Sequence, residues 1–567
     1  MTHSSQVTAR AFAALALSAT LAGGAFAQTS EDLKNDQKTT GDVLVYGMGY
    51  SAQRYSPLTR INKSNVKRMV PLWGYAMSDS NGAEAFTIVK DGVIYTTQHN
   101  VTVAVDALTG KQIWRTPHEY PQETLRVVCC GIVNRGAAMY NGKIIRALLD
   151  NGLVALDAKT GKEVWRTPAP EPATVANGYA MTGAPLVVNG VVIAGVAGAE
   201  FSIRGFLDGY DAETGKHLWR TYTVPAKGEP GSETWPADTA LTGGGSSWVT
   251  GSYDPDLDLV FWGVGNPAPW NPRGRVGDNL FTNSIWAIRP KTGERVWYYQ
   301  TSPNDPFDFD AVQTPVVATI KVQGKPQKVV MQANRNGFLY VLDAASGKLL
   351  AGNAYDRVNW AEGIDMKTGR PRLTDVFKGA LEGKQVTVWP SVTGTTNWQH
   401  MSFSPKTQKL YINTIHVGMT YQADEPKPLK PGAPSGTPSV KRTTVLDDPN
   451  VRGHLKAVDP MTGKSIWETP YKSPNWSSTL VTASNLVFTG VMTGEFQALD
   501  ADTGKVLWSW KSPSGIMGQP VTWEKNGKQY VTVMSGIGGV YAQRAGDPNL
   551  ENVPVGASLW TFGLFDK

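Results

Sequence analysis

Val105-Asp106-Ala107-Leu108-Thr109-Gly110-Lys111-Gln112-Ile113-Trp114 is a stretch whose pattern returns along the whole chain. An apolar residue precedes Asp, Thr-Gly-Lys follows, and Trp stands at a fixed distance after the lysine. Other copies, some degenerate, lie at Asn62–Trp73, Asp157–Trp165, Asp211–Trp219, Thr292–Trp297, Asp343–Ala351, Asp459–Trp467 and Asp500–Trp508. The copy that ends at Ala351 has lost its tryptophan.

Each copy predicts a β-hairpin, and every copy except Asp343–Ala351 carries the tryptophan ring. The Asp can cap the turn, Thr-Gly supplies its left-handed position, and a new strand begins before the Trp. Seven of the 19 tryptophans fall at this register, which suits the packing of one sheet on the next. Most copies are spaced by about 40–50 residues, as in four-stranded propeller blades.

The repeat therefore predicts an all-β, eight-bladed β-propeller with tryptophan-docking repeats. Residues 28–567 form one domain in this interpretation, and the C-terminal strands join the N-terminal segment to close the ring. The alternative is an open β-solenoid, whose repeats are usually shorter than these.

Two intervals between repeats are longer than one blade requires. The first spans 78 residues, from Trp219 to Trp297, and the second spans 116 residues, from Ala351 to Trp467. We expect the second to hold one blade, including a hairpin over 400–415, with surplus loops at 352–384 and 424–438. Long loops are often functional, so these are expected to shape the substrate entrance or a partner surface.

The first 27 residues read as a secretory signal. Arg10 precedes an apolar run over 11–22, and Ala25-Phe26-Ala27 ends the segment as a cleavage pattern. The alternative is a membrane anchor, but the run is shorter than the roughly 20 residues that span a bilayer. We expect cleavage after Ala27, a periplasmic location, and no membrane span in the remaining chain.

Charge and cysteine content exclude several classes of protein. Without the leader, 53 lysines and arginines face 48 aspartates and glutamates, scattered along the chain. Nucleic-acid binding usually needs a concentrated basic face, whereas a mild positive balance helps to meet an acidic protein. The only cysteines, Cys129 and Cys130, are adjacent, which excludes multi-cysteine metal sites and covalently attached haem. Export favours a bridge between them, and the alternative is two free thiols.

Four motifs occur in the order and spacing of one known family. They are Val127-Val128-Cys129-Cys130-Gly131-Ile132-Val133-Asn134-Arg135-Gly136, Gly198-Ala199-Glu200, Gly265-Asn266-Pro267-Ala268-Pro269-Trp270-Asn271 and Asp308-Phe309-Asp310. From about Tyr46 to Gly539 the chain resembles the pyrroloquinoline quinone (PQQ)-dependent methanol/ethanol dehydrogenases. The resemblance implies that a Cys129–Cys130 disulfide covers one face of PQQ and that Trp248 covers the other.

The same resemblance assigns the residues that surround the rest of the cofactor. They are Glu84, Arg135, Thr182, Gly198, Ala199, Arg335, Asn397 and Trp476. Guanidinium groups suit carboxylate and quinone oxygens, although surface salt bridging is the alternative for Arg135 and Arg335. The chain departs from many relatives at Ala197, where they have serine, so one hydrogen bond to the cofactor is in doubt.

The metal ligands that the resemblance implies are the oxygen donors Glu200, Asn266 and Asp308, which suit a hard cation. Family members that use lanthanides have a second aspartate two positions after the catalytic one, and here Asp310 stands there. An extended segment would point both carboxylates to one side. The extra negative charge favours one lanthanide(III) ion over Ca²⁺, the alternative being that Asp310 only orients the site.

The expected activity is that of a quinoprotein alcohol dehydrogenase. Asp308 is the expected catalytic base, Arg335 stabilises charge on the quinone oxygen, and hydride passes from a primary alcohol to PQQ. No haem motif follows the propeller, so electrons are expected to reach a separate periplasmic cytochrome c.

The stretch over 332–337 resembles ethanol-type members of the family more than methanol-type members, which implies primary alcohols such as ethanol as substrates. Methanol, secondary alcohols, polyvinyl alcohol and cyclic alcohols stay open as alternatives. A non-catalytic propeller scaffold shares the repeat but has no use for the cysteines and the acids together. The sequence leaves open whether the chain is a monomer or a homodimer.

Overall fold

The computed structural model describes residues 28–77, 81–128, 131–236, 239–427, 430–434, 439–539 and 546–565. The predicted leader and the Cys129–Cys130 pair lie outside the described residues. Among the helices in these ranges, which include α1 (Ser30–Asn35) and α2 (Gln122–Val127), none has the length and apolar character to cross a bilayer.

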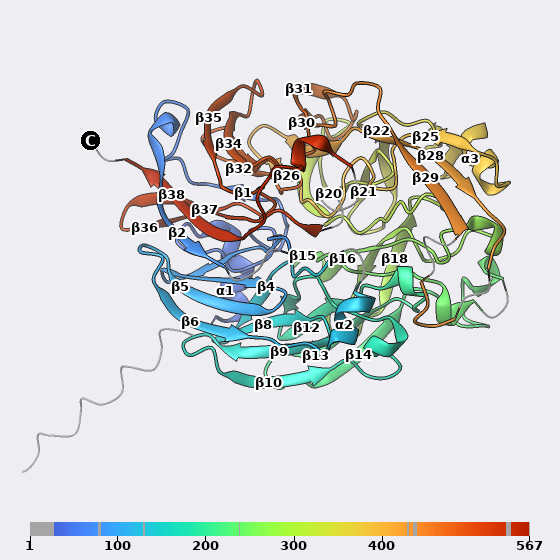
Figure 1. Ribbon diagram of the computed structural model, residues 1–567, viewed down its shortest axis with the longest axis horizontal. Coiled ribbons are helices and arrows are strands. Elements are labelled where there is room, and N and C mark those ends of the chain that lie inside the picture. The colour runs from blue at the N-terminus through green and yellow to red at the C-terminus, as the bar shows by residue number, and fades with distance from the viewer. Residues whose placement is uncertain are drawn as a thin grey trace, which may run out of the picture.

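Within the described ranges, eight antiparallel sheets follow one another in chain order around the molecule (Figure 1). The first four comprise β3 (Ile88–Lys90), β4 (Val93–Gln98), β5 (Val101–Asp106) and β6 (Gln112–Pro117); β7 (Ala137–Tyr140), β8 (Lys143–Leu148), β9 (Gly152–Asp157) and β10 (Glu163–Pro168); β11 (Leu186–Val188), β12 (Val191–Gly195), β13 (Phe206–Asp211) and β14 (His217–Tyr222); β15 (Ser252–Asp254), β16 (Leu259–Val264), β17 (Ser284–Ile288) and β18 (Arg295–Gln300). The next three comprise β19 (Val316–Val322), β20 (Lys325–Ala333), β21 (Phe338–Asp343) and β22 (Leu349–Ala354); β26 (Ser402–Ser404), β27 (Lys409–Ile415), β30 (Gly453–Val458) and β31 (Ser465–Tyr471); β32 (Leu480–Thr482), β33 (Leu486–Gly490), β34 (Glu495–Asp500) and β35 (Val506–Lys511), with β1 (Tyr55–Ser56) parallel to β32.

The eighth sheet closes the ring. It comprises β36 (Val521–Lys525), β37 (Lys528–Ser535), β38 (Ser558–Leu564) and, from the other end of the chain, β2 (Met69–Ala76). Strands β2 and β38 pair antiparallel, with Met69 opposite Leu564, and lie side by side in Figure 1. The predicted eight-bladed propeller and its closing unit are confirmed.

The repeat residues join neighbouring sheets. Trp114 at the edge of one sheet donates its indole N–H to the carbonyl of Ala158 in the next, at 2.9 Å. Gly161 lies on the face of that indole, and a Cβ there would come within 2.6 Å of the ring. The carboxylate of Asp157 accepts from the backbone N–H of Thr160 and so caps the turn. Asp, Gly and Trp therefore build one joint between two blades.

The long interval after Ala351 contains more regular structure than the sequence predicted. The expected hairpin over 400–415 is present as β26 and β27. Beyond it lie a hairpin of β23 (Ala361–Ile364) and β24 (Pro371–Leu373), helix α3 (Asp375–Leu381), and a three-stranded sheet of β25 (Val386–Val388), β28 (Gly418–Ala423) and β29 (Val440–Val445). We call this last sheet the insertion sheet. Of the two segments treated as surplus loops, 352–384 is thus largely structured, whereas the described part of 424–438 contains no helix or strand.

Candidate active site

A cavity of about 290 Å³ gathers most of the residues that the sequence singled out. The predicted residues that line it are Glu84, Arg135, Thr182, Gly198, Glu200, Trp248, Asp308, Asp310, Arg335, Asn397 and Trp476. Ala197, the departure from the family pattern, also lines it. Because these side chains come from positions 84 to 476, only the closed ring brings them together.

Two predicted residues lie just behind the cavity wall. Ala199 is fully buried in a short 3₁₀ turn, Ala199–Phe201, which carries Glu200 into the cavity. Asn266 is also buried, and its backbone N–H donates to the Asp310 carboxylate at 2.7 Å. Cys129 and Cys130 lie outside the described residues, so their predicted disulfide remains a prediction.

One guanidinium and two carboxylates form the centre of the site. Arg335 contacts the Asp308 carboxylate at 2.8 Å and the Asp310 carboxylate at 2.6 Å. The indole N–H of Trp248 also donates to Asp310, at 3.1 Å. Both carboxylates therefore point to one side, toward the same guanidinium. The sequence predicted that an extended segment would align them. Asp308 has a left-handed backbone (φ 65°), so a turn rather than an extended strand aligns the two carboxylates.

The site holds more negative than positive charge. Burial, together with Asp310, raises the pKa of Glu200 to about 7. Burial also raises the pKa of Asp308 well above its usual range, although Arg335 opposes the shift. Three buried carboxylates thus face one guanidinium. A cation beside these acids would lower both pKa values.

The donor set fits a hard metal ion. The side-chain oxygens Asn266 Oδ1 and Asp308 Oδ1 are buried and accept no hydrogen bond from any described residue. Buried oxygens without partners are rare unless an ion or a water completes them. With Glu200 and Asp310 alongside, the site offers carboxylate and amide oxygens, which are the ligands of Ca²⁺ and similar hard cations.

Another part of the cavity wall fits a flat anionic group. Arg135 forms a buried ion pair with Glu84 at 2.8 Å and donates to the Thr182 hydroxyl at 2.8 Å. Its guanidinium lies 4.7 Å from the centre of the Trp248 ring and 5.5 Å from that of Trp398. Indole faces and a fixed guanidinium suit a planar ring with carboxylates. The sequence missed Trp398, whose only signal was its place beside Asn397.

Two buried amides support this wall, and the sequence gave no sign of them. Gln313 accepts from the backbone N–H of Arg335 at 3.3 Å, and Gln399 accepts from that of Asn397 at 2.7 Å. The side-chain nitrogens of both glutamines have no hydrogen-bond partner among the described residues. Each glutamine therefore holds the backbone of a cavity residue in place.

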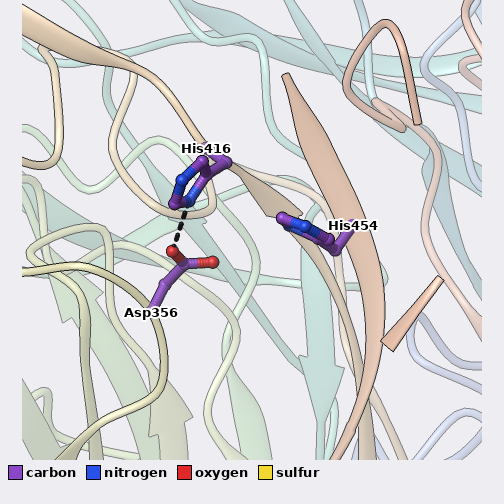
Figure 2. Close-up of side chains that lie close together, drawn as sticks. All are labelled: Asp356, His416 and His454. Carbon is purple, nitrogen blue, oxygen red and sulfur yellow. Dashed lines mark hydrogen bonds and ion pairs between the residues drawn. The ribbon is translucent and has the colours of Figure 1, made fainter. Parts of the chain in front are cut away.

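A second group of possible metal ligands lies outside the cavity lining. In Figure 2, Asp356 and His416 point toward one another, with His454 beside them. His416 contacts Asp356 at 2.6 Å through Nδ1 and Asp447 at 3.2 Å through Nε2, and Lys456 pairs with Asp356 at 2.9 Å. The hydrogen bond to Asp356 raises the pKa of His416. Protons and an ammonium group already neutralise these acids, so the acids in the cavity are the better metal candidate.

Comparison with known proteins identifies the family. Residues 44–364 and 451–531 match the model of the PQQ-containing glucose/ethanol/alcohol dehydrogenase β-propeller domain. The chain is 40% identical to the quinohemoprotein alcohol dehydrogenase ADH IIB of Pseudomonas putida, over 98% of this chain and 82% of the relative. It is 37% identical to the quinoprotein alcohol dehydrogenase PedH of Pseudomonas putida KT2440, over 97% of this chain and 96% of the relative.

A solved structure, a europium-containing methanol dehydrogenase, superposes with a TM-score of 0.88 at 33% identity, covering 94% of this chain and all of the other. Family model, relatives and solved structure agree with the propeller fold. The chain therefore belongs to the PQQ-dependent alcohol dehydrogenase family and is a quinoprotein alcohol dehydrogenase.

Proposed function

We propose that this enzyme oxidises primary alcohols to aldehydes in the cavity, in the periplasm, and passes the electrons to a separate cytochrome c. Methanol, secondary, polymeric and cyclic alcohols are the alternative substrates. The observation that carries the proposal is the meeting of Asp308, Asp310 and Arg335 beside the buried donors Glu200 and Asn266.

The residues present divide into two sets. Glu84, Arg135, Thr182, Trp248, Asn397 and Trp476, with the Gly198–Ala199 backbone, would hold PQQ, and Cys129–Cys130 would cover it. Glu200, Asn266, Asp308 and Asp310 would hold the metal. When bound, PQQ supplies a two-electron acceptor and the metal a Lewis acid.

Asp308 is the proposed base for the alcohol proton. Arg335 donates to its Oδ2 at 2.8 Å and so fixes the carboxylate in the cavity wall. The same contact opposes the upward shift that burial gives the pKa of Asp308, because a guanidinium nearby stabilises the ionised carboxylate. Arg335 also stabilises negative charge that develops beside it during oxidation.

Asp310 supports a lanthanide over calcium. It adds a third buried carboxylate beside Glu200 and Asp308, and a single guanidinium balances the three. A trivalent ion compensates this charge better than a divalent one. The likeness to a europium-containing methanol dehydrogenase is consistent with this choice.

One observation supports a separate electron acceptor. The two cysteines of the sequence are adjacent, so it contains no Cys-x-x-Cys-His haem site.

Reconstitution of the apoenzyme tests the proposal. PQQ is added with Ca²⁺ or with La³⁺, and alcohol-dependent reduction of a dye and of cytochrome c is followed across a panel of alcohols. We expect turnover of primary alcohols, faster with La³⁺. Absence of alcohol-dependent reduction with both ions and every alcohol would overturn the proposal.

A further inference from the structure

The insertion sheet belongs to no blade, yet it forms part of the cavity wall. Strand β28 supplies Met419 to the lining, and β29 supplies Arg442, Thr443 and Thr444. Thr443 and Thr444 are exposed, so this sheet lines the outer part of the cavity. Met419 also has a hydrogen bond to the segment that holds Arg335.

That segment is a tight turn, Ser391–Gly394, which comes shortly after β25. The N–H of Gly394 donates to the carbonyl of Ser391 at 2.8 Å and closes the turn. Within it, the carbonyl of Val392 accepts from Nε of Arg335 at 3.0 Å and from Nη2 of the same side chain. We call Ser391–Gly394 the arginine turn.

The carbonyl of Val392 fixes the direction in which the guanidinium of Arg335 faces. Nε and Nη2 contact this carbonyl, while Nη1 and Nη2 donate to Asp310 and Asp308. A guanidinium is planar and its donors form a rigid fork, so an acceptor on one edge sets the position of the donors on the other. A shift of the arginine turn would therefore change the contacts with both carboxylates, which now measure 2.8 and 2.6 Å.

The arginine turn also packs on the stem of Arg335. Gly394 has a positive φ of 77°, and a Cβ there would lie 2.0 Å from Cγ of Arg335. The next residue, Thr395, donates its N–H to the carbonyl of Arg335 at 2.9 Å. Residues 392–395 thus contact the guanidinium, the stem and the backbone of this arginine.

The insertion sheet holds the other side of the arginine turn. The N–H of Ser391 donates to the carbonyl of Val417 at 2.8 Å, and the N–H of Val392 donates to Sδ of Met419 at 3.3 Å. Met419 is buried and pairs with Val388, the last residue of β25. Val392 is therefore bound through its N–H to the insertion sheet and through its carbonyl to Arg335.

We infer that Met419 is a positioning residue for alcohol oxidation. Through Val392 it sets the direction in which the guanidinium of Arg335 faces the two carboxylates. This inference rests on the proposed function and adds to it a role for the insertion sheet. Loss of the sulfur lowers the rate of oxidation more than the binding of the alcohol, because a misplaced guanidinium stabilises developing charge less well.

Substitution of Met419 by leucine tests the inference. Met419→Leu keeps an apolar side chain of similar volume but removes the acceptor of the Val392 N–H. Holoenzymes with PQQ and La³⁺ are compared for kcat and KM with ethanol and with 1-hexanol, and for the rate of alcohol oxidation in a single turnover. We expect kcat and the single-turnover rate to fall about tenfold, equally for both alcohols, with KM changed less than about twofold.

Two further substitutions separate the sulfur from a general change in the core. Met331→Leu makes the same exchange at a buried methionine of β20 and is expected to leave kcat unchanged. Met419→Gln offers an amide oxygen to the same N–H and is expected to restore most of the rate.

A pair of glycines tests the arginine turn independently, even where Met419→Leu folds poorly. Gly394→Ala leaves Met419 in place but puts a methyl group against Arg335, and it is expected to lower kcat at least about a hundredfold. Gly324→Ala, also at positive φ but with no neighbouring atom within 4 Å of its Cβ, is expected to leave kcat unchanged.

Three outcomes would overturn the inference while the proposed function stands. They are an unchanged kcat in Met419→Leu, a loss confined to KM or to 1-hexanol, and a normal kcat in Gly394→Ala. The second outcome would show that Met419 only shapes the cavity wall. Failure of the wild type to oxidise any alcohol would instead overturn the proposed function, and this inference with it.

Discussion

Asp308 is held by its own backbone as well as by its neighbours. Its left-handed conformation turns the carboxylate toward Arg335, and Phe309 after it is fully buried. The motif Asp308-Phe309-Asp310 could be found from the sequence because its members are adjacent. Trp398, Gln313 and Arg442 could not, since each reaches the cavity only through the packing of a distant blade.

Asp308→Asn is expected to abolish most turnover. The amide keeps the shape of the side chain but cannot accept the alcohol proton, and loss of a positioned base typically costs about 10²–10⁴-fold in rate. We expect kcat to fall by this factor while the thermal midpoint of the reconstituted enzyme changes little. Asp502→Asn, at an exposed turn, serves as the control. Normal turnover by the Asp308 variant would contradict the assignment.

Asp310 is expected to decide which metal stabilises the protein. Binding of an ion to the folded state raises the thermal midpoint. With the wild type, La³⁺ is expected to raise it more than Ca²⁺ at equal concentration, because three carboxylates line the site. Asp310→Ala is expected to remove most of the difference. Equal shifts by both ions in the wild type would argue against the lanthanide assignment.

At the scale of elements, the blades could be predicted from the sequence because the Asp, Gly and Trp residues of one type of joint recur between them. Most joints place a turn glycine on the indole of the preceding blade, as Gly161 does on Trp114, but Gly463 faces Asn353 and Ala354 because the preceding blade has Ala351 in place of tryptophan. The insertion sheet lacks this signature because it is not a blade, so the sequence showed its length but not its strands. The strands β25, β28 and β29 are also far apart along the chain, which hides their pairing.

The joint can be tested with a pair of glycines. Gly161 and Gly324 both have positive φ, at 69° and 80°, so alanine is strained at either. A Cβ at Gly161 would lie 2.6 Å from the Trp114 ring. A Cβ at Gly324 would have no neighbouring atom within 4 Å. Gly324→Ala is expected to lower the free energy of unfolding by about 1 kcal/mol, because alanine is strained at positive φ. Gly161→Ala is expected to lower it by about 1–3 kcal/mol more, because the added methyl group also overpacks the joint. Urea unfolding compares them, and equal losses would refute the joint.

His416 is expected to make the outer part of the cavity sensitive to pH. His416 contacts Asp356 in the loop after β22 and Asp447 in the loop after β29, and so links the two loops. Lys456 also pairs with Asp356, and the ring of His454 packs against the ring of His416. Its pKa is raised in the folded protein. The stabilisation is therefore fully present below the unfolded pKa of about 6.5 and is lost as pH rises through the raised value.

Hydrogen exchange of the insertion sheet measures this effect. Protection of β28 and β29 in the wild type is expected to decrease as pH rises above neutrality, after correction for intrinsic exchange. His416→Gln keeps a polar side chain but cannot be charged, and its protection is expected to stay constant across the same range. The same pH response in both proteins would show that His416 is not its source.

At the scale of the whole molecule, the two ends of the chain meet where the ring closes. Strand β2 pairs with β38, and the indole of Trp508 donates to the carbonyl of Met69 at 2.9 Å. The sequence predicted this closure from the count of repeats, without its register. Pairing across about 490 residues leaves no local signal in the chain.

Deletion of 558–567 is expected to open the ring. Without β38, strand β2 loses its partner, and the eighth sheet loses one of its two inner strands. The thermal midpoint is therefore expected to fall by at least about 10 °C, and PQQ is expected not to bind. Deletion of 566–567 alone leaves β38 intact and is the control. An unchanged midpoint after the longer deletion would contradict this role of the closure.

The pairing of β2 with β38 also sets an order on biosynthesis. While the C-terminal end is still on the ribosome, strand β2 has no partner and the cavity has no complete wall. Redox prosthetic groups can then be captured only by a chain that has been released in full. Loading becomes the last event of maturation, and a truncated product cannot retain the quinone.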